Sequence, residues 1–346
     1  MKINLCETNL DGHHEIYLEN LLNISSTSKL FIDIKIEGNK KRIFNYIFDR
    51  KKLIKKFLSK DNEIFHLLYF DMIYTYFPLS SLNINKIILG TLHFVPEEKL
   101  KIILLKNFSK KIDLIVVHSE ILKEKLLKIG IKNVEVVHYP SFYDYSIIEP
   151  KEKLKKKFKL EDKIVLTTLG GTRNDKGLDI LLESFKYLNS ELKERIILNI
   201  AGKEETFKKE FIVQKSKENK INIRGKYGFL TDEEFMENVL LTDVMVMPYR
   251  KIFGGNSGPM TEAIVNKIPC ITPKGLNIGD LTEKYDLGLT FECENPKSLA
   301  ETIEKMILNK EKNEFFTSDY HKKLTVENFL RSYEEIYSKL EKGEYK

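Results

Sequence analysis

The sequence predicts an α/β protein with two doubly wound domains joined by a linker. The chain has 346 residues, which is long for a single hydrophobic core. Short β-branched runs alternate with stretches of helical spacing, and several runs are apolar on both faces, as parallel strands covered by helices are. This alternation stops between residues 139 and 162 and then begins again. Two separate parallel sheets explain the pattern most simply.

The first half of the chain contains six runs with strand character. They are "KINLCET" (2–8), "KLFIDIKI" (29–36), "IFHLLYF" (64–70), "KIILGTLH" (86–93), "DLIVVHS" (113–119) and "VEVVHYP" (134–140). Their alternation with helical stretches predicts a first Rossmann-like domain over residues 1–150.

A change of composition follows at "YPSFYDYSIIEPKEKLKKKFKLED" (139–162), which has two prolines, a lysine cluster and no strand pattern. We interpret it as the interdomain connection. Six more strand-like runs come after it: "KIVLTTLGG" (163–171), "RIILNIAG" (195–202), "INIRG" (221–225), "DVMVMPY" (243–249), "PCITP" (269–273) and "GLTFE" (288–292). They predict a second Rossmann-like domain over residues 151–320.

The end of the chain, residues 319–341, is predicted to form one or two helices. Its apolar residues recur at helical spacing: Leu324, Phe329, Leu330, Tyr333, Ile336, Tyr337 and Leu340. We expect residues 321–346 to contribute a helix that packs back toward the N-terminal domain.

Composition excludes several classes of protein. The hydrophobic fraction is 42%, and no apolar run approaches the roughly 20 residues of a membrane-spanning helix. The first residues lack the apolar core of a signal peptide, so we expect a cytoplasmic protein. Cys6, Cys270 and Cys293 are far apart in sequence and are expected to be buried, reduced thiols.

The net charge of +6 favours an anionic partner without identifying it. No recognisable nucleic-acid-binding module is present, so nucleic acid is not an expected partner. A nucleotide-dependent oxidoreductase is disfavoured, because no G-x-G-x-x-G follows the first strand.

The first candidate motif is "GGTRNDKG" (170–177), between a predicted strand and a predicted helix. Glycines such as Gly171 let an anion approach the backbone at a helix start, and Arg173 and Lys176 would add donors suited to phosphate oxygens. Asp175 is expected to be a turn-former. The other interpretation, a solvated turn before an amphipathic helix, stays open for these eight residues alone.

The second candidate motif is "GGNSGPMTEAIVNKIPC" (254–270). Ser257 is predicted to cap a helix that has Pro259 in its first turn and is closed by Pro269. Backbone amides at Asn256, Ser257 and Gly258 would form a second anion cradle. Glu262, one turn into this helix, could accept hydrogen bonds from a vicinal diol such as ribose, or could merely complement the helix dipole.

Taken together, "GGTRNDKGLDILLESF", "IAGKEE", "TDVMVMPYR" and "SGPMTEAIVNKIPCIT" occur in the order and spacing of one family. Residues 160–310 resemble the C-terminal domain of group-1, family 4-like glycosyltransferases, which are retaining enzymes of the GT-B fold. The resemblance implies two Rossmann-like domains facing each other across a cleft. It also implies that Arg173 and Lys176 bind the donor diphosphate, that the Ser257–Gly258 turn supports phosphate or sugar, and that Glu262 holds the ribose.

The implied activity is transfer of a sugar from a nucleotide-diphosphate sugar to a glycan or lipid-linked acceptor. The resemblance implies a hexosyl-type transfer with retention of configuration, in bacterial surface polysaccharide or glycoconjugate synthesis. No D-x-D motif occurs, so cations and helix ends are expected to neutralise the leaving diphosphate without a metal or a cofactor. Many family members carry a Glu where this chain has Gly254. That departure keeps open an alternative, a non-catalytic GT-B partner or chaperone of another glycosyltransferase.

The N-terminal half resembles the family more weakly. Gly12 and His13 lie in the loop after the first strand and are candidates for contact with donor or acceptor. His93 matches a histidine that the family places near the transferred sugar. Residues 39–60 interleave basic and apolar side chains. We predict either a surface helix with a solvated lysine face or a contact with the inner face of an anionic membrane.

Overall fold

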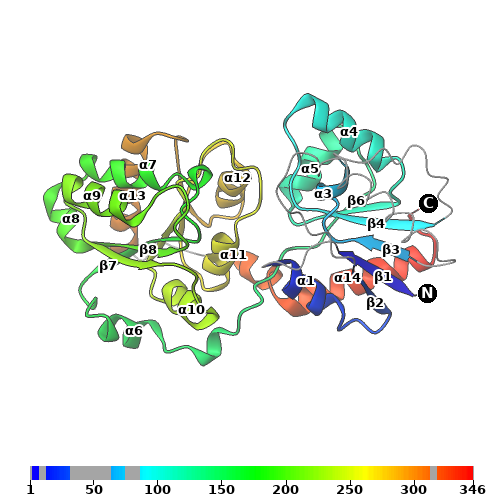
Figure 1. The fold of residues 1–346 in the computed structure, drawn as a ribbon, viewed down its shortest axis with the longest axis horizontal. Coiled ribbons are helices and arrows are strands. Elements are labelled where there is room, and N and C mark those ends of the chain that lie inside the picture. The colour runs from blue at the N-terminus through cyan, green and yellow to red at the C-terminus, as the bar shows by residue number, and fades with distance from the viewer. Residues whose placement is uncertain (1, 8–12, 32–63, 75–85, 312–317, 346) are drawn as a thin grey trace, which may run out of the picture. The chain divides into compact units, whose positions relative to one another are not determined.

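The computed structural model describes residues 2–7, 13–31, 64–74, 86–311 and 318–345. The chain divides into two compact units. One comprises Met1–Pro140 together with Thr325–Lys346, and the other comprises Ser141–Leu324. Each unit contains a six-stranded sheet in which every strand pairing is parallel (Figure 1). The prediction of two doubly wound α/β sheets is confirmed.

The sheet of the first unit has the order β2-β1-β3-β4-β5-β6. Its strands are β1 (Ile3–Glu7), β2 (Thr27–Phe31), β3 (Ile64–Leu67), β4 (Ile87–Leu92), β5 (Leu114–Val117) and β6 (Val134–Val136). The helices between them are α1 (His13–Leu21), α3 (Asp71–Tyr74), α4 (Lys99–Ser109) and α5 (Glu120–Lys128). Strand order reverses next to β1, which makes the carboxyl ends of β1 and β3 the position where such sheets bind ligands.

The last helix of the chain, α14 (Val326–Glu341), belongs to the first unit and contacts α1 (Figure 1). It buries Phe329, Tyr333, Ile336, Tyr337 and Leu340, which are five of the seven residues whose spacing predicted a terminal helix. Two of its tyrosines also make buried hydrogen bonds. The hydroxyl of Tyr333 lies 2.5 Å from that of Tyr17, and the hydroxyl of Tyr337 lies 2.8 Å from Nδ1 of His66. The terminal segment therefore returns to the N-terminal sheet, as expected.

The sheet of the second unit has the order β12-β11-β10-β7-β8-β9. Its strands are β7 (Ile164–Leu169), β8 (Ile196–Gly202), β9 (Ile223–Tyr227), β10 (Val244–Val246), β11 (Cys270–Pro273) and β12 (Gly288–Phe291). The chain builds outward from β7 through β8 and β9, then returns to place β10 on the other side of β7. The carboxyl ends of β7 and β10 therefore form the topological switch point of this sheet.

Helices cover both faces of the second sheet. In one layer α7 (Leu178–Ser184) contacts both α9 (Lys209–Asn219) and α13 (Pro296–Glu311). In the other, α10 (Asp232–Leu240) contacts both α6 (Lys151–Lys157) and α11 (Gly258–Val265). The remaining elements are α8 (Ser190–Arg195), α12 (Asn277–Lys284) and the 3-10 helices η2 (Tyr145–Ile147), η3 (Asn174–Lys176), η4 (Phe185–Tyr187) and η5 (Asp319–Lys323).

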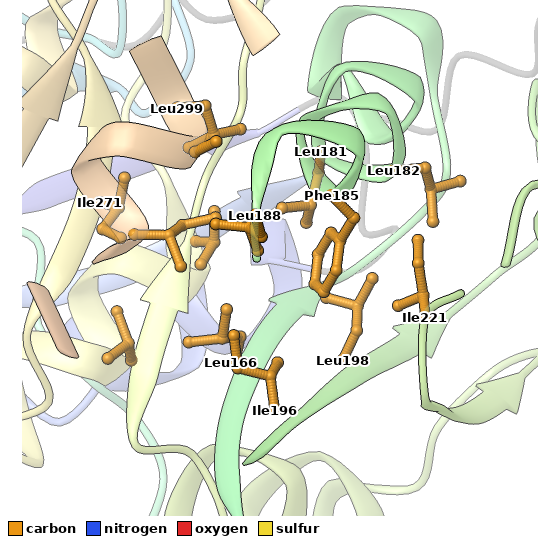
Figure 2. Close-up of a cluster of buried hydrophobic side chains, with 14 of the residues drawn as sticks. Leu166, Leu181, Leu182, Phe185, Leu188, Ile196, Leu198, Ile221, Ile271 and Leu299 are labelled. Atoms are coloured by element: carbon orange, nitrogen blue, oxygen red, sulfur yellow. The ribbon is translucent and has the colours of Figure 1, made fainter. Parts of the chain in front are cut away.

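The largest apolar cluster of the second unit lies between the α7 layer and the sheet. Figure 2 shows Leu181 and Phe185 directed toward Leu166 and Leu198 of the strands, and all four side chains are buried. Burying such a side chain contributes roughly 1.5–3 kcal/mol. This cluster holds α7 against β7 and so fixes the backbone of the loop that joins them.

Several sequence predictions are corrected or lie outside the described residues. Cys6 and Cys270 are buried free thiols, but Cys293 is only half-buried. Helix α11 ends at Val265, ahead of Pro269. Among the described residues, no helix is both long and apolar enough to cross a membrane. Gly12 and the basic segment 39–60 are outside the described residues.

Candidate functional site

The first candidate motif forms a tight loop at the carboxyl end of β7. After Leu169 the chain turns at Gly170, passes through η3 and turns again at Gly177, which adopts the left-handed conformation with φ of +60°. A Cβ atom at Gly177 would lie 2.1 Å from the carbonyl oxygen of Pro248. Only glycine fits here, because the loop backbone is pressed against the segment that follows β10.

Arg173 and Asp175 form a two-pronged ion pair within this loop. Nε of Arg173 donates to Oδ1 of Asp175 at 2.9 Å, and Nη2 donates to Oδ2 at 2.8 Å. This pair holds the pKa of the Asp175 carboxyl below its usual value. Three of the five N–H groups of the guanidinium take no part in the pair. Asp175, predicted only as a turn-former, therefore fixes the plane of the Arg173 side chain.

Lys176 folds back over the turn. Its Nζ lies 3.3 Å from the carbonyl oxygen of Leu169 and 5.6 Å from the ring centroid of Tyr249. A Cβ atom at Gly170 would lie 2.5 Å from this ammonium group, and one at Gly171 would lie 2.2 Å from a carboxylate oxygen of Glu205. Because they lack a Cβ atom, Gly170 and Gly171 let the side chains of Lys176 and Glu205 lie close to the loop backbone.

Arg250 ties the loop to the end of β10. Its backbone N–H donates to the carbonyl oxygen of Asp175 at 2.9 Å, and its Nε donates to that of Asn174 at 2.9 Å. Its Nη2 also contacts Oδ2 of Asp179 at 2.5 Å. Arg250 was not among the predicted site residues, although its position just after a buried strand at a candidate site is a signal that the sequence offers.

The second motif begins at the helix start of α11. Ser257 is the N-cap, as predicted, and its Oγ accepts a hydrogen bond from the backbone N–H of Met260 at 3.4 Å. The same Oγ lies 3.0 Å from the hydroxyl of Tyr249, the residue whose ring Lys176 covers. Lys176, Tyr249 and Ser257 therefore form a continuous chain of contacts, and the two motifs meet at the switch point.

Two other residues of this turn were predicted to bind an anion. Gly258 is the first residue of α11, where backbone amides are free of intrahelical partners. Oδ1 of Asn256 is buried without a hydrogen-bond partner among the described residues. Gly254 has open space around it, and its carbonyl oxygen accepts from Nδ2 of Asn277 at 3.3 Å.

Glu262 is buried on α11, with 5% of its surface exposed. Its Oε2 accepts hydrogen bonds from the hydroxyls of Ser141 at 2.5 Å and Tyr145 at 2.8 Å. Burial raises the pKa of the Glu262 carboxyl to about 7, although these two hydrogen bonds act to lower it. Glu262 thus lies beyond the first turn of α11, and its carboxylate accepts two side-chain hydrogen bonds.

His93 lies in the first unit, just beyond the end of β4. Its backbone N–H donates to both carboxylate oxygens of Asp71 at 3.0 Å, and its Nε2 lies 3.0 Å from the carbonyl oxygen of Leu68. A carbonyl can only accept, so Nε2 carries the proton. Burial and nearby His118 lower the pKa of His93 well below its usual value. The ring is thus neutral and offers Nδ1 as an acceptor.

An aromatic stack surrounds His93. Its ring is parallel to that of Tyr69 at a centroid distance of 3.9 Å, and Tyr69 stacks on His14 at 3.6 Å. Nδ1 of His14 lies 3.2 Å from Oε2 of Glu7 at the end of β1. Residues from β1, β3 and β4 therefore meet at the switch point of the first sheet. His13 begins α1 next to this stack in sequence.

The charged and polar groups at the switch point of the second sheet indicate which ligands the second unit can bind. In the second unit, Arg173 and Lys176 provide positive charge, and Gly258 at the start of α11 provides a backbone N–H without an intrahelical partner, which suit a diphosphate. A buried carboxylate lies one turn further along α11 and suits a vicinal diol. Among the described residues, no group of three or more His, Cys, Asp or Glu side chains is placed to hold a metal ion.

Solved structures with the same fold include glycosyltransferases. Sucrose-phosphate synthase from Thermosynechococcus elongatus superposes with a TM-score of 0.76 at 14% identity, over 99% of this chain and 100% of that one. Anabaena HepE, in complex with UDP and glucose, gives 0.72 at 14% identity, over 98% and 99%. WaaG, a glycosyltransferase involved in lipopolysaccharide biosynthesis, gives 0.60 at 12% identity, over 95% and 94%. The two parallel sheets are thus those of the GT-B fold.

Sequence comparison is informative for the second unit. No curated protein matches the sequence. The family described as "Glycosyl transferases group 1" matches residues 150–322, half of the chain, and the match contains both motifs and the buried carboxylate. The chain therefore belongs to the group-1 glycosyltransferases.

Proposed function

We propose that this protein transfers a sugar from a nucleotide-diphosphate sugar, which the second unit binds at the switch point of its sheet. The observation that carries the proposal is the meeting of two loops there. Lys176 from the loop after β7 covers Tyr249, whose hydroxyl contacts the N-cap Ser257 of α11. Complexes of HepE with UDP and with UDP-glucose support a donor of this class.

Each predicted residue has a role in this proposal. The N–H groups of Arg173 outside its pair with Asp175, and the ammonium of Lys176, bind the diphosphate. The amides of Ser257 and Gly258 bind phosphate or sugar oxygens at the start of α11. Glu262 accepts hydrogen bonds from the ribose. Asn256, with its buried Oδ1 without a partner among the described residues, and Gly171 complete the donor site.

We further propose that transfer proceeds with retention and needs no metal or cofactor. The positive charges of Arg173 and Lys176 and the α11 start would stabilise negative charge as it develops on the leaving diphosphate. His93, a neutral ring with Nδ1 as acceptor, would bind a sugar hydroxyl. Gly12 and His13 stay predicted contacts of the donor or acceptor.

The acceptor is proposed to be a glycan or lipid-linked sugar of bacterial surface polysaccharide or glycoconjugate synthesis. The similarity in fold to WaaG, which is involved in lipopolysaccharide biosynthesis, supports this class. We expect the protein to act in the cytoplasm. A lipid-linked acceptor would bring it to the inner membrane face, where the basic segment 39–60 is the proposed contact.

A thermal-shift screen against a panel of nucleotide sugars tests the donor, because a ligand that binds only the folded protein raises its melting temperature. With the donor in hand, Arg173→Ala and Lys176→Ala are expected to lose most transfer activity while keeping the wild-type melting temperature. NMR of the product is expected to show the anomeric configuration of the donor. Unchanged turnover in both variants would contradict the diphosphate assignment.

Gly254 favours one alternative, a non-catalytic partner of another glycosyltransferase. Many family members carry a carboxylate at this position, and the space around Gly254 is open. Nucleotide binding without sugar transfer to any acceptor would favour the partner role. Turnover by the isolated protein would exclude it.

A further inference from the structure

Two hydroxyl groups converge on one oxygen of Glu262. We propose that Ser141 and Tyr145 are positioning residues, which hold Oε2 of Glu262 and leave Oε1 as the acceptor for the ribose hydroxyls of the donor. The hydroxyls lie 2.5 Å and 2.8 Å from Oε2. This inference rests on the proposed nucleotide-sugar donor and identifies which residues set its recognition.

The direction of both hydrogen bonds is defined. Oγ of Ser141 accepts a hydrogen bond from the backbone N–H of Tyr143 at 3.3 Å, so its own proton is free to point to Glu262. The phenol proton of Tyr145 also points to Oε2. An ionised carboxylate can only accept, so two donors on one oxygen are satisfied together.

The chain around these hydroxyls fixes them in place. The backbone N–H of Ser141, which is itself buried, donates to the carbonyl oxygen of Leu324 at 3.1 Å. Tyr145 begins η2, and the N-cap Asp144 accepts from the backbone N–H of Ser146 at 3.0 Å. Both partners of Glu262 therefore come from an ordered segment of the second unit.

The second oxygen of Glu262 is in a different situation. Oε1 accepts no hydrogen bond from the described residues and is not sealed from solvent, although the residue is 95% buried. A buried carboxylate without partners would rotate or take up a proton. Two donors on Oε2 act against both changes, because they restrict rotation of the carboxylate and lower the pKa that burial raises to about 7, and they leave one oxygen available. A ribose diol, which presents two donors side by side, matches that oxygen.

The test uses a substrate change that removes only the diol. UDP, GDP and ADP are titrated into the wild-type protein by calorimetry, and the tightest binder is compared with its 2′,3′-dideoxy form. Ser141→Ala and Tyr145→Phe are expected to lower affinity for the ribose form on the order of tenfold, as expected for a weakened hydrogen bond to a charged group. Affinity for the dideoxy form should stay within about twofold of wild type, within the scatter of such measurements.

Tyr143→Phe is the matched control. It removes a phenol hydroxyl from the same segment, but Tyr143 stacks on Phe235 and its side chain makes no hydrogen bond to Glu262 among the described contacts. We expect wild-type affinity for both nucleotide forms. Melting temperatures of all three variants identify any loss of folding, and Ser141→Ala serves as the second variant if Tyr145→Phe is unstable.

The outcomes separate this inference from the function on which it rests. Equal loss for ribose and dideoxy forms, or no loss for either, would overturn the positioning role while leaving the donor site intact. If the wild-type protein binds none of the three nucleotides, or does not distinguish ribose from dideoxy forms, the assignment of Glu262 to ribose fails, and this inference fails with it.

Discussion

Glu262 shows what a single residue can and cannot reveal in a sequence. Its position one turn after the N-cap Ser257 could be predicted from the sequence, because both residues lie in one short motif. Its partners were not, because Ser141 and Tyr145 are 121 and 117 residues away in the sequence. The signal available was the aromatic content of "YPSFYDY", which is unusual for a solvated linker.

Glu262→Gln should change how stability depends on pH. The pKa of the carboxyl rises from its usual 4.5 to about 7 on folding. The wild-type protein therefore has its full contribution from this group below pH 4.5 and loses it as the pH rises through 7, by up to about 3 kcal/mol. The glutamine does not titrate. As the pH rises from 5 to 8, the unfolding free energy of the variant should therefore increase relative to that of the wild type.

Chemical denaturation of both proteins at pH 5 and pH 8 measures this difference. Asp71, whose pKa burial also raises to about 7, is present in both proteins and cancels. We also expect Glu262→Gln to weaken nucleotide binding, so that stability and binding change in opposite directions. A difference in unfolding free energy that does not vary with pH would contradict the burial of an ionisable carboxylate.

At the scale of elements, the loop after β7 depends on a close backbone approach. Gly177→Ala should destabilise the second unit, because a left-handed residue with a side chain costs roughly 1–2 kcal/mol and the new Cβ would also collide with Pro248. Movement of the loop away from Pro248 should displace Lys176 and weaken nucleotide binding. Thermal unfolding and calorimetry measure the two effects.

Gly275→Ala is the matched control in the same unit. Gly275 has φ of +76°, but a Cβ there would meet no atom within 4 Å. It should therefore show only the conformational cost and keep wild-type nucleotide affinity. If both variants lose equal stability and neither loses affinity, the contact with Pro248 does not position the loop.

Elements were the most predictable level of this structure. All twelve strand-like runs overlap an observed strand, because a central strand of a covered parallel sheet must be apolar on both faces. Ten runs contain the whole strand, whereas β2 begins two residues before its run and β9 ends two residues after its run. The contacts between the loop after β7 and the chain at the end of β10 could not be predicted from the sequence. The contacts of Arg250 with the loop and the pairing of Arg173 with Asp175 depend on how chain segments cross in space, which periodicity does not encode.

At the scale of the whole molecule, the chain leaves the first unit at Pro140 and returns to it at Thr325. Deletion of residues 325–346 should unfold the first unit. It removes five large buried side chains of α14, each worth roughly 1.5–3 kcal/mol, which together are comparable to the stability of a domain. The second unit should stay folded and keep its nucleotide affinity.

Hydrogen exchange resolves the two units in this experiment. We expect fast exchange in β1, β3 and β4 and unchanged protection in β7 and β8. Deletion of residues 342–346 alone keeps α14 and should leave both units protected. Loss of protection in both units on deletion of 325–346 would show that they do not fold independently.

The proposed function requires the second unit to bind a nucleoside diphosphate through Arg173 and Lys176. Calorimetry with a nucleoside diphosphate and with the matching monophosphate isolates the contribution of the second phosphate, because the two ligands share base and ribose. We predict that the wild-type protein prefers the diphosphate by tenfold or more, about 1.4 kcal/mol, and that Arg173→Ala combined with Lys176→Ala abolishes this preference. An undiminished preference in the double variant would contradict the claim.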